Sequence, residues 1–205
     1  DLEYLRERVE AGNTYKGFFF KMADGIDVME LGDFKPIGTS TKPFYGSFDG
    51  NNVQFNIERE SSDHYQGLFG YFGFGTIQNL SITGTIKGAN HVGSVVGYKE
   101  SGNIINVYNE AIIKGSNYVG GIVGYVCADG DNVPVTVENT SAGDIVWNDD
   151  SESIKAVPYI GGVAGYVTAG SFESNINSGA LAINKPMDDL DWGGVIGASA
   201  VAVER

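Results

Sequence analysis

The residues of this chain whose types and spacing could perform chemistry are three groups of carboxylates. They are Asp129 and Asp131; Asp149, Asp150 and Glu152; and Asp188, Asp189 and Asp191. A pair of carboxylates can hydrolyse a glycosidic bond, and clustered carboxylate oxygens also suit Ca²⁺. Every group adjoins Gly, Asn, Ser or Pro. The favoured interpretation is therefore solvated turns, with weak calcium binding second and catalysis third.

The remaining reactive side chains form no known catalytic or metal-binding motif. The two histidines, His64 and His91, lack a partner at metal-ligand spacing, and the sequence contains neither HExxH nor GxSxG. His91 aligns with Tyr118 of the next repeat, which favours an ordinary surface or turn position for it. The single Cys127 excludes an internal disulfide, and its place beside Val126 favours a small buried residue. The sequence therefore predicts no catalytic residue, no cofactor and no metal site.

The elements that must position these side chains repeat one glycine phrase. It reads GLFGY at 67–71, VGSVVGY at 92–98, VGGIVGY at 119–125, IGGVAGY at 160–166 and WGGVIGA at 192–198. The last glycines lie at positions 70, 97, 124, 165 and 197, so they are 27, 27, 41 and 32 residues apart. A period of this length, with loop insertions in the longer units, is typical of a stacked solenoid.

Apolar residues within each unit come in short runs bounded by turn residues, which is a strand pattern. At an offset of 27, residues 76–80 align with 103–107 and residues 86–88 with 113–115. We therefore expect an all-β fold, a right-handed parallel β-helix of about six turns. Side chains at equivalent positions should stack as ladders: Tyr71, Tyr98, Tyr125 and Tyr166 in one, and Asn79 and Asn106 in another.

The two ends of the chain differ. Leu2, Leu5 and Val9 share one face of a predicted helix, which should cap the first turn. Residues 199–205 read as a strand with no cap, so either the protein continues or this end supports end-to-end self-association. We expect a single domain over 1–205, with a cap helix at 1–12, leader turns at 13–66 and repeats at 67–205.

The glycine phrases resemble the GLUG motif, a bacterial repeat found in tandem. The leader segments at 34–39 (FKPIGT) and 43–52 (PFYGSFDGNN) also resemble those that precede such arrays. The resemblance covers nearly the whole chain. It implies a secreted or cell-surface bacterial protein of the structural or adhesin-like kind.

Composition limits the partners. The chain has 13 basic and 26 acidic residues and a formal net charge of −13. Nucleic acid is disfavoured because a phosphate backbone requires a basic stripe, and docking on an anionic membrane is disfavoured for the same reason. No segment approaches the roughly 20 apolar residues of a membrane span, so membrane insertion is not expected.

The interval of 41 residues between the glycines at 124 and 165 exceeds the repeat length of 27 residues by 14. This repeat therefore carries extra chain, which we place at 128–134 and 147–158. Trp147, with Asp149 and Asp150 beside it, is the candidate anchor for a glycan or protein partner, unless its ring packs under its own loop. The sequence thus predicts a non-enzymatic structural or adhesion module that binds a host or matrix glycan or protein. The alternative is a polysaccharide lyase or hydrolase, since β-helices also host such enzymes.

Overall fold

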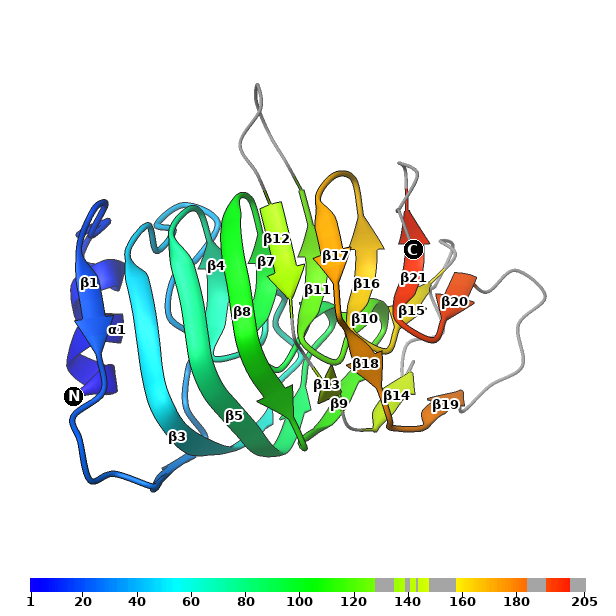
Figure 1. Ribbon diagram of the computed structural model, residues 1–205, viewed down its shortest axis with the longest axis horizontal. Coiled ribbons are helices and arrows are strands. Elements are labelled where there is room, and N and C mark those ends of the chain that lie inside the picture. The colour runs from blue at the N-terminus through cyan, green and yellow to red at the C-terminus, as the bar shows by residue number, and fades with distance from the viewer. Residues whose placement is uncertain (128–134, 139–140, 143, 148–157, 184–190, 200–205) are drawn as a thin grey trace.

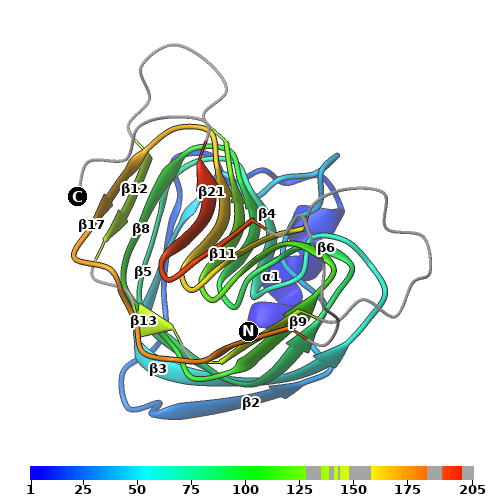
Figure 2. The same cartoon turned by 90° about the vertical axis from the view of Figure 1, so that its right-hand side faces the viewer.

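The computed structural model confirms a β-solenoid built from parallel sheets (Figure 1). It describes all residues except 128–134, 139–140, 143, 148–157, 184–190 and 200–205. Each coil contributes strands to successive walls, and every ladder between the named strands is parallel. Viewed along the solenoid axis, the walls enclose one central core (Figure 2).

The longest wall is a 12-stranded sheet. Its strands are β1 (Phe19–Lys21), β2 (Val28–Gly32), β3 (Ser47–Glu60), β5 (Thr76–Lys87), β8 (Gly102–Asn109), β9 (Ile112–Gly115), β12 (Val135–Glu138), β13 (Ser141–Ala142), β14 (Ile145–Trp147), β17 (Ser171–Glu173), β18 (Ile176–Asn177) and β19 (Leu181–Ile183). In register, Phe48, Ile77, Ile104 and Val137 follow one another along this wall and are all buried.

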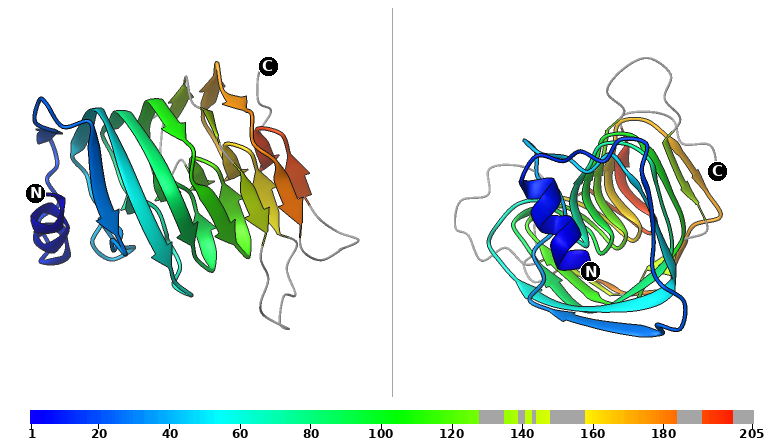
Figure 3. Two further views of the ribbon diagram at one scale, coloured as in Figure 1. Left: turned by 90° about the horizontal axis from the view of Figure 1, so that it is seen from below. Right: turned by 90° about the vertical axis from the view of Figure 1, so that its left-hand side faces the viewer.

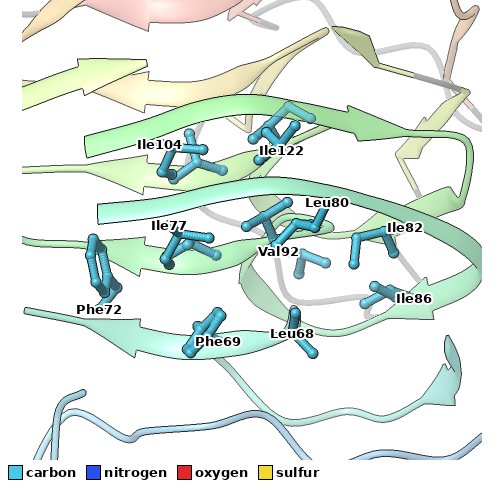
Figure 4. Close-up of a cluster of buried hydrophobic side chains, with 14 of the residues drawn as sticks. Leu68, Phe69, Phe72, Ile77, Leu80, Ile82, Ile86, Val92, Ile104 and Ile122 are labelled. Carbon is cyan, nitrogen blue, oxygen red and sulfur yellow. The ribbon is translucent and has the colours of Figure 1, made fainter. Parts of the chain in front are cut away.

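Two shorter walls close the coil. The four-stranded sheet contains β6 (Asn90–Val92), β10 (Asn117–Gly120), β15 (Tyr159–Gly161) and β20 (Asp191–Gly193). The five-stranded sheet contains β4 (Phe69–Phe72), β7 (Val96–Lys99), β11 (Val123–Val126), β16 (Ala164–Val167) and β21 (Ile196–Ser199). Figure 4 shows buried side chains of successive coils, such as Leu68, Val92 and Ile122, pointing into the shared interior.

The solenoid has about four turns, so the prediction of six was too high. The leader residues explain the difference. They supply β1, β2 and β3 to the longest wall, but they reach the five-stranded wall only through the isolated bridges of Ile37 with Phe69 and Phe44 with Phe72. They therefore form incomplete coils, since a full turn requires a strand in each wall.

The N-terminal cap is confirmed. Helix α1 (Leu2–Glu10) has Asp1 as its N-cap, and the side chain of Asp1 accepts a hydrogen bond from the Glu3 backbone N–H. The helix lies across the end of the solenoid (Figure 3, right). Leu2, Leu5 and Val9 are buried as expected. Of the strand predicted at 199–205, only Ser199 lies within the described residues, as the last residue of β21.

The asparagine ladder is also present. Asn106 Nδ2 donates to Asn79 Oδ1 at 2.8 Å, and Asn79 Nδ2 donates to Asp49 Oδ1 at 3.2 Å. Asn79 and Asn106 have φ values of 54° and 53°. Asparagine tolerates this left-handed conformation better than most residues, so the ladder both turns the chain and ties neighbouring coils together.

Candidate functional site

Most of the predicted site falls outside the described residues. This holds for Asp149 and Asp150, and for Asp129, Asp131, Glu152, Asp188 and Asp189. Trp147 was expected at the start of a loop, but its backbone ends strand β14, where it pairs with Gly115 and Ile183. The site around Trp147 therefore stays a prediction, as does weak calcium binding by the acidic loops. Within the described part of the chain, no group of three or more His, Cys, Asp or Glu side chains is placed to hold a metal ion.

The predicted tyrosine ladder is confirmed along the five-stranded wall. The ring centroids of Tyr71 and Tyr98 are 4.6 Å apart, those of Tyr98 and Tyr125 are 5.0 Å apart, and those of Tyr125 and Tyr166 are 5.3 Å apart. These spacings match the distance of about 4.8 Å between neighbouring strands. The ladder therefore follows directly from the stacking of the coils.

A second aromatic ladder, which sequence reasoning missed, runs beside the first. Tyr65 stacks on His91 at 4.8 Å, His91 on Tyr118 at 4.8 Å, and Tyr118 on Tyr159 at 5.3 Å. His91 was expected at an ordinary surface or turn position; it is half-buried in strand β6, and its ring is sandwiched between two tyrosines. The alignment of His91 with Tyr118 was the available signal, since equivalent positions in a solenoid must stack.

The close spacing of the coils depends on glycines that face this second ladder. A Cβ on Gly97 would lie 2.8 Å from the Cα of Tyr65 in the preceding coil, and one on Gly124 would lie 2.7 Å from the His91 carbonyl carbon. A Cβ on Gly165 would lie 2.7 Å from the carbonyl carbon of Tyr118. These glycines therefore allow two backbone segments to pack in direct contact, which is a structural role.

The ladders present edges to solvent, because neighbouring rings cover each other's faces. A sugar stacks on a ring face, so the inner members of either ladder offer no such platform. Burial and like charge from His64 lower the pKa of His91 to about 4, and burial, with the negative charge of Glu100, raises the pKa of Tyr71 to about 12. Both side chains are therefore neutral at pH 7. The Nδ1 atom of His91 is buried and has no hydrogen-bond partner among the described residues.

Lys99 is a buried amine in the five-stranded wall. It occupies the position of Phe72 and Val126 in the neighbouring strands, and its side chain is fully buried. Nζ donates to the backbone oxygen of Gly102. Burial lowers the pKa of Lys99 well below its usual range. An amine enclosed in this way cannot contact a dissolved polysaccharide, so Lys99 offers no means of neutralising an acidic sugar.

A pocket bordered by many charged and polar residues lies where the N-terminal cap meets the first coils, and we call it the cap pocket. Its volume is about 310 Å³. It is lined by Arg6, Glu10, Lys35, Pro36, Gly38, Thr39, Ser40, Arg59, Asp63, His64, Tyr65 and Gln66. The pocket therefore joins one face of α1, the 35–40 segment and the turn that follows β3.

The two arginines of the cap pocket are held in place by neighbouring polar side chains. Arg59 donates to Asp33 at 2.6 Å and to Gln66 at 3.0 Å, and it lies 3.4 Å from Asp63. Arg6 donates to Glu10 at 2.6 Å. Glu10 and Asp63 are thus exposed carboxylates that face guanidinium groups, whereas the general acid of a glycosidase needs a buried, unpaired carboxyl. Neither of these two carboxylates therefore has the surroundings of such an acid.

Comparisons with protein-family models, with curated proteins and with solved structures find no match to this chain. The class of the protein is therefore that of its fold, a parallel β-solenoid capped by a helix. The described part of the chain contains no helix that is long and apolar enough to cross a membrane.

Proposed function

We propose that this chain is a non-enzymatic module of a secreted or cell-surface bacterial protein, and that it binds a host or matrix glycan or protein. The observation that carries the proposal is the continuous stacking of the coils. Parallel ladders join neighbouring coils, and two aromatic ladders and one asparagine ladder run along them. Such a body is a rigid spacer from which loops can project.

The resemblance of the glycine phrases to GLUG repeats also supports this proposal, because such repeats are known from adhesin-like surface proteins. The net charge of −13 supports a glycan or protein as partner over nucleic acid. The alternative, a polysaccharide lyase or hydrolase, rests on the acidic groups at 129–131, 149–152 and 188–191. The charged groups of the cap pocket do not favour that alternative, because each of its carboxylates is paired with an arginine.

Replacement of Trp147 by Ala tests the loop surface. We expect an unchanged melting temperature together with lost binding on a glycan array or to host cells, because a large ring flanked by carboxylates is a typical contact residue. The measurement combines thermal unfolding with array or cell binding of the whole chain. A lowered melting temperature, or binding equal to that of the unmodified protein, would contradict a role for Trp147 in recognition.

A further inference from the structure

The second aromatic ladder ends where the cap pocket begins. His91 covers one face of Tyr65, with only 12° between the ring planes. The preceding coil contributes the 36–38 segment, because Ile37 bridges Phe69 and a Cβ on Gly70 would approach both the Gly38 oxygen and the Tyr65 oxygen. This segment and Tyr65 line the pocket together. The pocket therefore adjoins Tyr65, the first ring of this ladder.

Tyr65 consequently differs from the inner rings of its ladder. Tyr118 is stacked between His91 and Tyr159, whereas no ring in the described part of the chain stacks on the second face of Tyr65. A ring that has one face free of aromatic partners and adjoins polar groups suits the C–H face of a sugar, which leaves the sugar hydroxyls for hydrogen bonding.

The charges around the pocket select against simple ions. Arg6, Lys35 and Arg59 are cationic, while Glu10 and Asp63 are anionic. A small anion would meet the two carboxylates, and a metal cation would meet the three basic groups. A neutral polyhydroxylated ligand uses both kinds, because every hydroxyl can donate to a carboxylate and accept from a guanidinium or ammonium.

Several of the polar groups are already fixed before a ligand arrives. Arg59 is only 8% exposed and Gln66 only 2% exposed, and the two are hydrogen-bonded to each other. Arg6 is held by Glu3 and Glu10. Groups that are ordered in advance lose little entropy on binding, so even a small ligand can gain net affinity from them.

We propose that the cap pocket binds one neutral sugar ring, presented as the end or a branch of a glycan, with Tyr65 as the stacking platform. This inference rests on the proposed function, for which it names a ligand class and a place. The volume of about 310 Å³ lies at the lower end of the roughly 300–1,000 Å³ of ligand pockets, which suits a single ring.

The test uses the whole chain and methyl glycosides of glucose, galactose, mannose, fucose and N-acetylglucosamine. Glucuronate and inorganic phosphate serve as charged comparisons, and binding is measured by calorimetry and saturation-transfer NMR. We expect at least one neutral glycoside to bind more tightly than either charged probe. Tyr65→Ala should weaken that binding at least tenfold, and Lys35→Ala should weaken it several-fold.

Tyr118→Ala is the matched control, because it removes a ring of the same ladder that does not line the pocket. We expect it to bind the glycoside as the unmodified chain does. Lys35 is exposed, so its variant tests the pocket even if Tyr65→Ala fails to fold.

The proposal would be overturned if no neutral glycoside binds, or if glucuronate or phosphate binds more tightly than every neutral glycoside. Equal losses in Tyr65→Ala and Tyr118→Ala with no loss in Lys35→Ala would also overturn it. If Tyr65→Ala and Lys35→Ala both still bind glycans as the unmodified chain does, the proposal is also overturned. The proposed function would then remain intact. Conversely, the chain could bind glycosides in the pocket but bind neither cells nor a glycan array. That result would overturn the proposed function alone.

Discussion

Replacement of Gly124 or Gly165 by Val should destabilise the protein by on the order of 3–5 kcal/mol. A Cβ on Gly124 would lie 2.5 Å from the backbone nitrogen of Val92, and one on Gly165 would lie 2.6 Å from that of Val119. Backbone of the same molecule cannot move away as a flexible side chain would, so the coils themselves must separate. Chemical denaturation, with the slope compared between variants, measures the loss.

Gly194 is the matched control for this prediction. It belongs to the last of the glycine phrases, yet a Cβ on it meets nothing within 4 Å among the described residues. Gly194→Ala should therefore change the free energy of unfolding by less than about 1 kcal/mol. Similar losses at all three positions would contradict the assignment of the first two glycines to close contacts between coils.

Acid should weaken the fold through His91. Its pKa is lowered from 6.5 to about 4 in the folded protein, chiefly by burial. Between pH 6.5 and pH 4, His91 is therefore protonated in the unfolded chain but stays neutral in the folded chain. The stability associated with a neutral His91 is complete above pH 6.5, falls as the pH drops toward 4, and falls no further below that value.

The expected loss from this residue between pH 7 and pH 4 is about 2–3 kcal/mol. The pKa difference sets the upper value, and cation–π attraction between a protonated ring and Tyr65 and Tyr118 offsets a part of it. The other groups that face His91 are His64, Tyr98 and Tyr125, none of which supplies a negative charge at these pH values.

His91→Tyr isolates the effect, because tyrosine occupies the equivalent place at Tyr118, where φ is 54° against 61° at His91. Carboxylates elsewhere titrate equally in both proteins, so their contribution cancels in the comparison. Denaturation at pH 7, 6, 5 and 4 should show that the variant loses about 2–3 kcal/mol less than the unmodified chain. Parallel pH profiles would show that His91 is not held neutral by the ladder.

The sequence was sufficient to predict the features that repeat. Glycines at a fixed offset predicted the coils, and Tyr71 and Tyr98 predicted the first ladder, because stacking places equivalent residues one above another. The apolar stripe of Leu2, Leu5 and Val9 predicted the cap helix. In each case the physical cause acts between neighbouring residues or between equivalent positions, and both are visible in one sequence.

The features that do not repeat were missed. The number of turns was overestimated because leader residues with strand patterns join one wall without completing a coil. The second ladder was hidden by the substitution of histidine for tyrosine at position 91. The cap pocket brings Arg6 of the helix beside Arg59 and Tyr65, and no motif links residues so far apart in the chain.

The central claim is that this solenoid binds without catalysing a reaction, and a turnover assay tests it most directly. The whole chain is incubated with neutral and acidic polysaccharides, with and without calcium, and new chain ends are measured. We predict no turnover of any substrate. Reproducible depolymerisation that disappears when Asp188, Asp189 and Asp191 are all replaced by Asn would contradict the claim and establish a polysaccharide-degrading enzyme.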